Sequence, residues 1–222
     1  MHILPMETLI NISFLPMKNQ SRKKYPPTIS QKAIFVQLKK AMQPRVILDS
    51  QKLNFTITRL CHQLIEQHKD FSKSAIIGVQ PRGVYLADRI HKKLTEILKK
   101  KDIDYGKLDI TFYRDDFRLK SKPMIADEMD ITFDLEGRNI ILIDDVLYTG
   151  RTIRAALDAI LDYGRPADVE LLVLIDRRLQ RHLPIQAKYV GKVIDSISSE
   201  KVKVEWKETD GVDKVWIVED KD

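Results

Sequence analysis

The chain has 222 residues, of which 43% are hydrophobic, and this suffices for one domain of ordinary size with a core. Its net charge of +6 resides in residues 1–41, where seven lysines and arginines accompany one acid. The charge therefore gives no reason to predict nucleic-acid binding by the rest of the chain. The single cysteine excludes an internal disulfide, and no apolar run of about 18 residues could span a bilayer, so we expect a cytoplasmic protein without a membrane segment.

Residues 1–41 lack a sustained helical or strand period, and Pro26-Pro27 interrupts them. We expect this part to be a poorly ordered basic leader, followed by one domain over residues 42–222. A functional alternative for the leader is a basic arm that binds RNA.

The remainder of the chain alternates short apolar runs with helical stripes. The runs predict buried strands at residues 46–48, 74–79, 107–113, 140–143 and 169–175. Apolar stripes at helical spacing follow from Leu53, Leu86 and Ile153. An alternating pattern at 201–206 that returns at 215–217 predicts a C-terminal β-hairpin. We therefore expect an α/β domain with a mostly parallel sheet flanked by helices.

Residues 139–152 join a buried strand to a helix through a polar loop. Asp144 and Asp145 stand at the carboxyl end of the apolar run, and Thr149–Thr152 precede the helix. Gly150 allows close backbone approach, and the threonine hydroxyls and helix N–H groups can bind a phosphate. Two adjacent carboxylates would repel phosphate, so they should hold sugar hydroxyls, a Mg²⁺ ion or both. The alternative, a plain buried strand with acids at its end, leaves the threonine loop unexplained.

This pattern of four apolar residues, two acids, a spacer and TGRT resembles the 5-phosphoribosyl-1-pyrophosphate (PRPP) motif of type I phosphoribosyltransferases. The longer string DDVLYTGRT, with DYGRP after it, is similar to the branch of that family that transfers phosphoribose to uracil and regulates pyrimidine genes. The resemblance covers roughly residues 42–218 and begins near Met42, which is therefore a candidate native start. N-terminal sequencing of the native product tests this hypothesis.

The resemblance implies the reaction uracil + PRPP to UMP + pyrophosphate, with Mg²⁺ bound to PRPP and no protein metal site of its own. It implies catalytic roles for the acids at 144 and 145, which would hold the ribose, and for two arginines that would bind the leaving diphosphate. The implied catalytic residues are Asp144, Asp145, Arg82 and Arg114. The implied substrate-binding residues are Pro81, Arg82, Gly83, Arg114, Asp144, Asp145, Val146, Leu147, Tyr148, Thr149, Gly150, Arg151, Thr152, Arg177, Val190 and Gly191.

Three further segments resemble functional loops of the family. Pro81–Gly83 resembles the pyrophosphate loop, in which a non-proline cis peptide is expected at the Pro81–Arg82 bond. Residues 114–136 begin like the catalytic flexible loop, with a solvated hairpin as the alternative. Residues 188–192 resemble the small hood segment that reads the uracil edge through main-chain atoms.

The sequence departs from the family after the strand at 169–175. Family members usually read DRGHRELPI, whereas this chain reads DRRLQRHLPI, one residue longer and without the glycine-histidine pair. Because that stretch serves RNA in relatives, binding of pyrimidine-operon leader RNA is left open. The candidate phosphate-contacting residues are Arg45, Arg59, Arg178 and Arg181.

Two other functions compete with the main interpretation. One is a UMP-sensing, RNA-binding attenuator with little catalysis, and the other is a purine phosphoribosyltransferase. Related purine enzymes place an acid where Tyr148 stands, so no side-chain general base is assigned. Relatives suggest a homodimer or tetramer. We expect His62 and His68 to lie at the surface, since we see no further residues that would complete a metal site.

Overall fold

The computed structural model describes residues 44–114, 130–197 and 199–220, all within the compact unit Met42–Asp222. The expected leader over 1–41, the candidate start at Met42 and most of the expected flexible loop therefore lie outside the described residues. Within these ranges, no helix is both long enough and apolar enough to cross a membrane.

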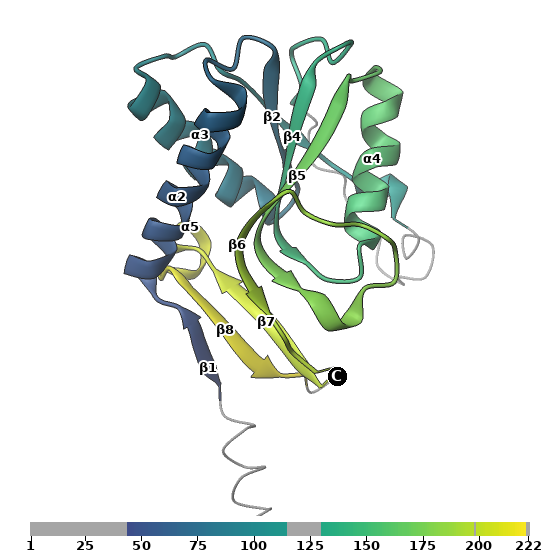
Figure 1. Ribbon diagram of the computed structural model, residues 1–222. Coiled ribbons are helices and arrows are strands. Elements are labelled where there is room, and N and C mark those ends of the chain that lie inside the picture. The colour runs from purple at the N-terminus through teal and green to yellow at the C-terminus, as the bar shows by residue number, and fades with distance from the viewer. Residues whose placement is uncertain (1–43, 115–129, 198, 221–222) are drawn as a thin grey trace, which may run out of the picture. The chain divides into compact units, whose positions relative to one another are not determined.

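Two sheets organise the unit (Figure 1). The main sheet has five strands in the order β3-β2-β4-β5-β6, and all its neighbours are parallel. The small sheet has three antiparallel strands in the order β1-β8-β7. The strands are β1 Arg45–Leu48, β2 Ser74–Val79, β3 Asp104–Leu108, β4 Asn139–Leu147, β5 Asp168–Arg177, β6 Tyr189–Ile194, β7 Glu200–Glu205 and β8 Lys214–Glu219. The predicted α/β fold with a parallel sheet and a C-terminal hairpin is confirmed.

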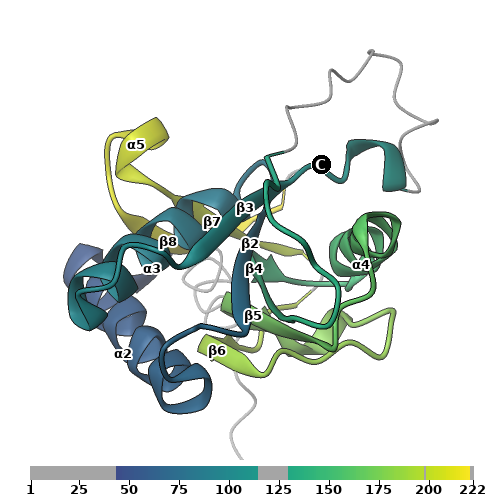
Figure 2. The same cartoon turned by 90° about the horizontal axis from the view of Figure 1, so that it is seen from above.

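Helices cover both faces of the main sheet, with α2 and α3 on one side and α4 on the other (Figure 2). The helices are α2 Ser50–His68, α3 Gly83–Leu98, α4 Arg151–Tyr163 and the short α5 Lys207–Asp210. Neighbouring residues of one strand pack on opposite faces, so Ile141 belongs to the core beneath α2 and α3, and Ile140 to the core beneath α4. Burial on both faces explains why the central strands are almost continuously apolar.

β3 and β4 end at residues that differ from those predicted from the sequence, which were 113 and 143. β3 ends at Leu108, and Thr111–Tyr113 form a 3₁₀ turn, because Asp109 accepts hydrogen bonds from the backbone N–H and hydroxyl of Thr111. β4 continues beyond Ile143 to Leu147, since β5 pairs with it as far as Leu147. The acidic residues 144 and 145 therefore lie within the strand.

Residues 188–192 were expected in the hood, but all of them except Lys188 belong to β6 of the main sheet. β6 pairs in parallel with β5, and a Cβ atom on Gly191 would lie 2.4 Å from the Leu174 carbonyl oxygen. Only glycine allows this approach of the edge strand to its neighbour. The small sheet is formed instead by the predicted hairpin, whose connection contains α5, together with β1.

His68 lies in the interior, contrary to the prediction, whereas His62 is exposed as predicted. The His68 side chain is 3% exposed; its Nδ1 is 2.9 Å from Ser74 Oγ and its Nε2 is 3.0 Å from Glu170 Oε2. His68 follows Leu64 by four residues and therefore falls on the buried face of α2. This helical spacing in the sequence could have indicated that His68 is buried. Its hydrogen-bonding partners on β2 and β5 explain why burial of the imidazole is tolerated.

Candidate active site

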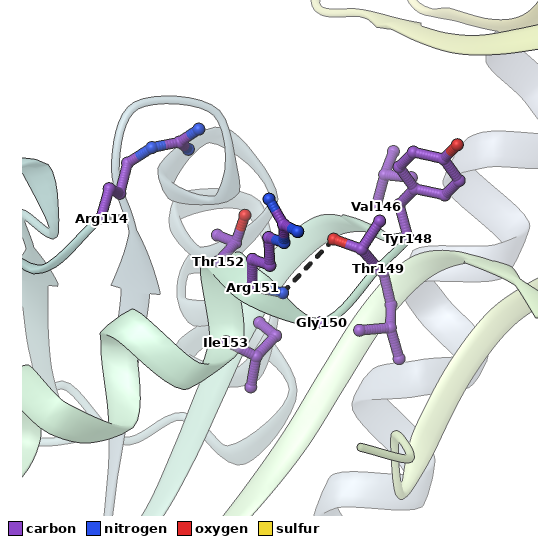
Figure 3. A pocket seen from close by; sticks show the side chains of 9 residues that line it. Arg114, Val146, Tyr148, Thr149, Gly150, Arg151, Thr152 and Ile153 are labelled. Carbon is purple, nitrogen blue, oxygen red and sulfur yellow. Dashed lines mark hydrogen bonds between the residues drawn. The ribbon is translucent and has the colours of Figure 1, made fainter. Parts of the chain in front are cut away.

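The site forms at the edge of the main sheet where the carboxyl ends of β2 and β4 lie. These strands pair in parallel, with Gly78 opposite Ile143, so the loops after both strands open at one edge of the sheet. A cavity of about 240 Å³ lies there. Figure 3 shows its lining, with Arg114 and Tyr148 at opposite ends of the view. The lining residues are Arg114, Val146, Leu147, Tyr148, Thr149, Gly150, Arg151, Thr152 and Ile153.

Asp144 and Asp145, the acid pair, are almost completely buried near the carboxyl end of β4. The backbone N–H of Asp145 donates to Asp144 Oδ1 over 2.8 Å. Burial, followed by the neighbouring carboxylate, raises the pKa of Asp144 well above its usual value. Burial also raises the pKa of Asp145, although Arg82 opposes the shift. A ligand that brings hydroxyl donors or positive charge would therefore stabilise the ionised form of both carboxylates.

Arg82 connects the acid pair with the small sheet. Its Nε lies 3.5 Å from Asp145 Oδ2, and its Nη2 donates to the Val204 carbonyl and lies 3.3 Å from Asp210 Oδ2. Sequence reasoning did not identify Val204 and Asp210 at the site. They belong to a distant antiparallel segment, and nothing in the local pattern links them to Arg82.

The loop before α3 lies against β4. A Cβ atom on Gly83 would lie 2.6 Å from the Ile143 carbonyl oxygen and 2.9 Å from Asp144 Cα, so glycine is required for this contact. The cis peptide bond is Gln80–Pro81, one bond before the expected Pro81–Arg82 position. The sequence-based expectation was wrong about the bond: the cis form occurs at an X–Pro bond, the type that most readily adopts it.

The loop Thr149–Thr152, called the phosphate loop below, leads directly into α4. Gly150 has a φ of +92°, a conformation that favours glycine, and the backbone N–H of Arg151 donates to Thr149 Oγ1 over 3.4 Å (Figure 3). The Thr149 carbonyl accepts hydrogen bonds from the backbone N–H groups of His182 and Leu183 over 3.0 and 3.2 Å. The loop is thus held by the segment that follows β5.

Arg177, an expected substrate contact, packs against Tyr148. Its guanidinium carbon lies 3.9 Å from the Tyr148 ring centroid, and it donates to Ser196 Oγ and to the Glu200 carbonyl over 2.8 and 2.7 Å. The residue is 5% exposed and is absent from the cavity lining. Arg177 therefore links Tyr148, which precedes the phosphate loop, to the segment that joins β6 and β7.

Val190 and Gly191 lie on β6, apart from the cavity lining. Their carbonyl oxygens accept hydrogen bonds from Arg59 Nη2 over 3.1 and 2.6 Å. The structure thus places Arg82 beside the acid pair, which precedes the phosphate loop in the chain, while these two carbonyls are engaged with α2. Arg82 and the acid pair, like Val190 and Gly191, do not line the cavity. Arg59, expected among the RNA contacts, is exposed, and its guanidinium makes these intramolecular hydrogen bonds.

Comparison with known sequences identifies the family. The Phosphoribosyl transferase domain family matches residues 45–209. A protein of Deinococcus deserti named "Bifunctional protein PyrR" is 50% identical, over 78% of this chain and 95% of the relative. Proteins of the same name from Bacillus cereus and Deinococcus radiodurans are 44% and 48% identical, over 78% and 79% of this chain and 96% and 95% of their own lengths.

Solved structures support the same fold. The hypoxanthine phosphoribosyltransferase of Trypanosoma cruzi superposes with a TM-score of 0.60 at 14% identity, over 79% of this chain and 96% of that one. The Staphylococcus aureus hypoxanthine phosphoribosyltransferase gives 0.58 at 18% identity, over 80% and 93%. At these identities the similarity concerns the fold. The sequence relatives are closer, and the chain belongs to the phosphoribosyltransferase family and, within it, to the group of proteins named bifunctional protein PyrR.

Proposed function

We propose that this protein is a uracil phosphoribosyltransferase, which converts uracil and PRPP to UMP and pyrophosphate. The observation that carries the proposal is that the acid pair lies near the carboxyl end of β4 and that the phosphate loop, which lines the cavity, follows it after three residues. A single phosphorylated pentose can therefore contact both. The carboxylates suit its hydroxyls, and the loop suits its phosphate.

The reaction breaks the bond between ribose C1 and the diphosphate, so positive charge develops on the ring and negative charge on the leaving group. Asp144 and Asp145 hold the ribose hydroxyls and favour the cationic ring. Arg82 and Arg114 bind the departing diphosphate, and the phosphate loop anchors the 5′-phosphate. The protein thus contributes orientation and charge stabilisation. Tyr148 is not assigned as a general base.

The acid pair fits a magnesium ion that arrives with PRPP. Among the described residues, no cluster of three or more histidine, cysteine or acidic side chains could hold a metal by itself. Magnesium commonly binds one or two carboxylates and completes its coordination with substrate phosphates and water. Asp144 and Asp145 would supply the protein's share. The ion would neutralise charge on the diphosphate, and its positive charge would offset the burial that disfavours the ionised carboxylates.

The name of the relatives supports a second function, and the resemblance points to UMP-dependent binding of pyrimidine-operon leader RNA. Three of the four candidate arginines have partners within the protein: Arg59 of α2 with a carbonyl of β6, Arg178 with Asp195 and Arg181 with Asp176. Arg59 and Arg178 are nevertheless exposed. Filter binding to leader RNA with and without UMP tests this function. Absent or salt-insensitive binding would remove the regulatory role.

The choice of base separates the proposal from the purine alternative. Incubation with PRPP and, separately, uracil, hypoxanthine, guanine and adenine tests it most directly. We expect UMP from uracil and no nucleotide from the purines, and a purine nucleotide as the main product would overturn the proposal. We also propose that the protein acts as a homodimer or tetramer, which light scattering after gel filtration measures.

A further inference from the structure

The segment that follows β5 contacts two successive carbonyls at the start of the phosphate loop. Arg181 Nη1 donates to the Tyr148 carbonyl over 2.7 Å. The next carbonyl, that of Thr149, accepts from His182 and Leu183. The other terminal nitrogen of Arg181 forms an ion pair with Asp176 at the end of β5. Arg181 thus links the end of one strand to the loop that leaves its neighbour.

These bonds determine where the loop's N–H groups point. A trans peptide unit is planar, and its C=O and N–H point in opposite directions. When Arg181 holds the Tyr148 carbonyl, the N–H of Thr149 must point away from the segment after β5. The bonds to the Thr149 carbonyl fix the N–H of Gly150 in the same way. Thr149 and Gly150 both line the cavity.

We propose that Arg181 is a positioning residue for the phosphate loop, and that it sets the affinity of the site for the 5′-phosphate of PRPP and UMP. The inference rests on the proposed function. It gives Arg181 a role in substrate binding, in addition to the RNA contact that its positive charge suggests. The Arg181 side chain is 18% exposed, and both of its terminal nitrogens have partners in the protein.

The geometry requires arginine. Its planar guanidinium can serve a carboxylate and a carbonyl at the same time from fixed directions, whereas a lysine ammonium carries one compact charge on a flexible chain. Asp176 pairs in register with Leu147, the residue before Tyr148, so the two acceptors lie on adjacent strand ends. A lysine would keep the positive charge without holding both strands.

The chain offers a matched control three residues away. Arg178 is also paired with a carboxylate, that of Asp195, but its side chain is 60% exposed, and Asp195 lies outside the phosphate loop. Arg178→Gln therefore removes the same charge from the same segment. Comparison of Arg181→Gln, Arg181→Lys and Arg178→Gln separates loop positioning from a general effect of charge.

The experiment combines steady-state kinetics with equilibrium dialysis of UMP and uridine. We expect Arg181→Gln to raise the KM for PRPP and the Kd for UMP by about tenfold, as for one lost charge-assisted hydrogen bond. The KM for uracil and the Kd for uridine, which lacks the phosphate, should change less than about twofold on the same reasoning. Arg181→Lys should be intermediate, and Arg178→Gln should match the wild type.

Equal weakening of UMP and uridine would overturn the proposal, as would an Arg181→Gln enzyme with the wild-type KM for PRPP. If Arg181→Gln does not fold, the ratio of UMP to uridine affinity in Arg181→Lys decides, and an unchanged ratio overturns the proposal. A wild-type protein that does not convert uracil and PRPP contradicts the proposed function instead, so the two failures are distinguishable.

Discussion

Arg82, at the start of α3, forms an ion pair with Asp210 of α5, with 3.3 Å between Nη2 and Oδ2. The same side chain faces Asp145 over 3.5 Å. The pyrophosphate loop is thereby tied both to the acid pair and to the small sheet. A diphosphate that binds Arg82 must share it with these carboxylates or displace them, so Asp210 competes with the leaving group.

Replacement of Asp210 by asparagine should lower the KM for PRPP. The neutral amide no longer competes for Arg82 but can still accept the hydrogen bond from the Trp206 backbone N–H. Because the pair is partly exposed to solvent, its effect should be small, and we expect a decrease in KM of about twofold to fivefold. Glu208→Gln is the control, since Glu208 lies in the same turn and pairs with Arg89. A raised KM in Asp210→Asn would refute the competition.

Arg82→Ala should impair steps that involve pyrophosphate more than it impairs UMP binding. The guanidinium is assigned to the diphosphate, which UMP lacks. We expect kcat/KM for PRPP to fall by roughly one to two orders of magnitude, the scale of a lost charge-assisted contact to a developing charge. The Kd for UMP should remain within about twofold if the contact is confined to the diphosphate. Equal losses in both measurements would contradict this assignment.

The acid pair should be required for turnover yet costly for stability. Asp144→Asn combined with Asp145→Asn should abolish turnover by weakening PRPP binding, and an unchanged rate would discard the proposed role of the acids. The raised pKa of Asp144 means that the native state binds this proton more tightly than the unfolded chain does. Ionisation therefore destabilises the fold as pH rises through that pKa.

Asp144→Asn alone should accordingly raise the melting temperature at pH 7. A gain of about 1 kcal/mol corresponds to roughly 2–4 °C in a domain of this size. The asparagine oxygen can still accept the N–H of Asp145. Scanning calorimetry of the single variant checks the sign, and a lower melting temperature at neutral pH would count against a destabilising carboxylate.

Gly150→Ala tests the shape of the phosphate loop, with Gly137→Ala as its partner variant. Both glycines have positive φ, +92° and +68°, so each substitution should cost about 1–2 kcal/mol of unfolding free energy. A Cβ atom on Gly150 would also lie 3.2 Å from Ile185 Cδ1, whereas nothing lies within 4 Å of one on Gly137. Only Gly150→Ala should raise the KM for PRPP. Similar kinetics in the two variants would argue against a phosphate role for the loop.

His68 should make the fold less stable in mild acid. Burial lowers its pKa from the usual value of 6.5, although Glu170 opposes the shift, so the unfolded chain binds more protons than the native state just below that value. Stability is then lost as pH falls through 6.5. His68→Gln should show a smaller loss between pH 7.5 and 5.5 in urea unfolding, while the exposed His62→Gln should behave like the wild type. Identical slopes in all three proteins would exclude this effect.

The sequence by itself determined the fold class and the centre of the proposed site. Strands buried on both faces need apolar residues at almost every position, so β2 and β5 could be located from their continuous apolar runs. The acid pair and the phosphate loop are contiguous in the chain, and the local order of strand, loop and helix is enough to predict that they share one edge of the sheet.

Only the tertiary structure decided which distant residues act together. Arg82 pairs with Asp210, Arg181 donates to the Tyr148 carbonyl, and β6 extends the main sheet. Each outcome depends on a contact between segments far apart in the chain, made by a flexible side chain or an edge strand with more than one available partner. Local periodicity carries no information about such choices, because packing of the whole domain selects among them.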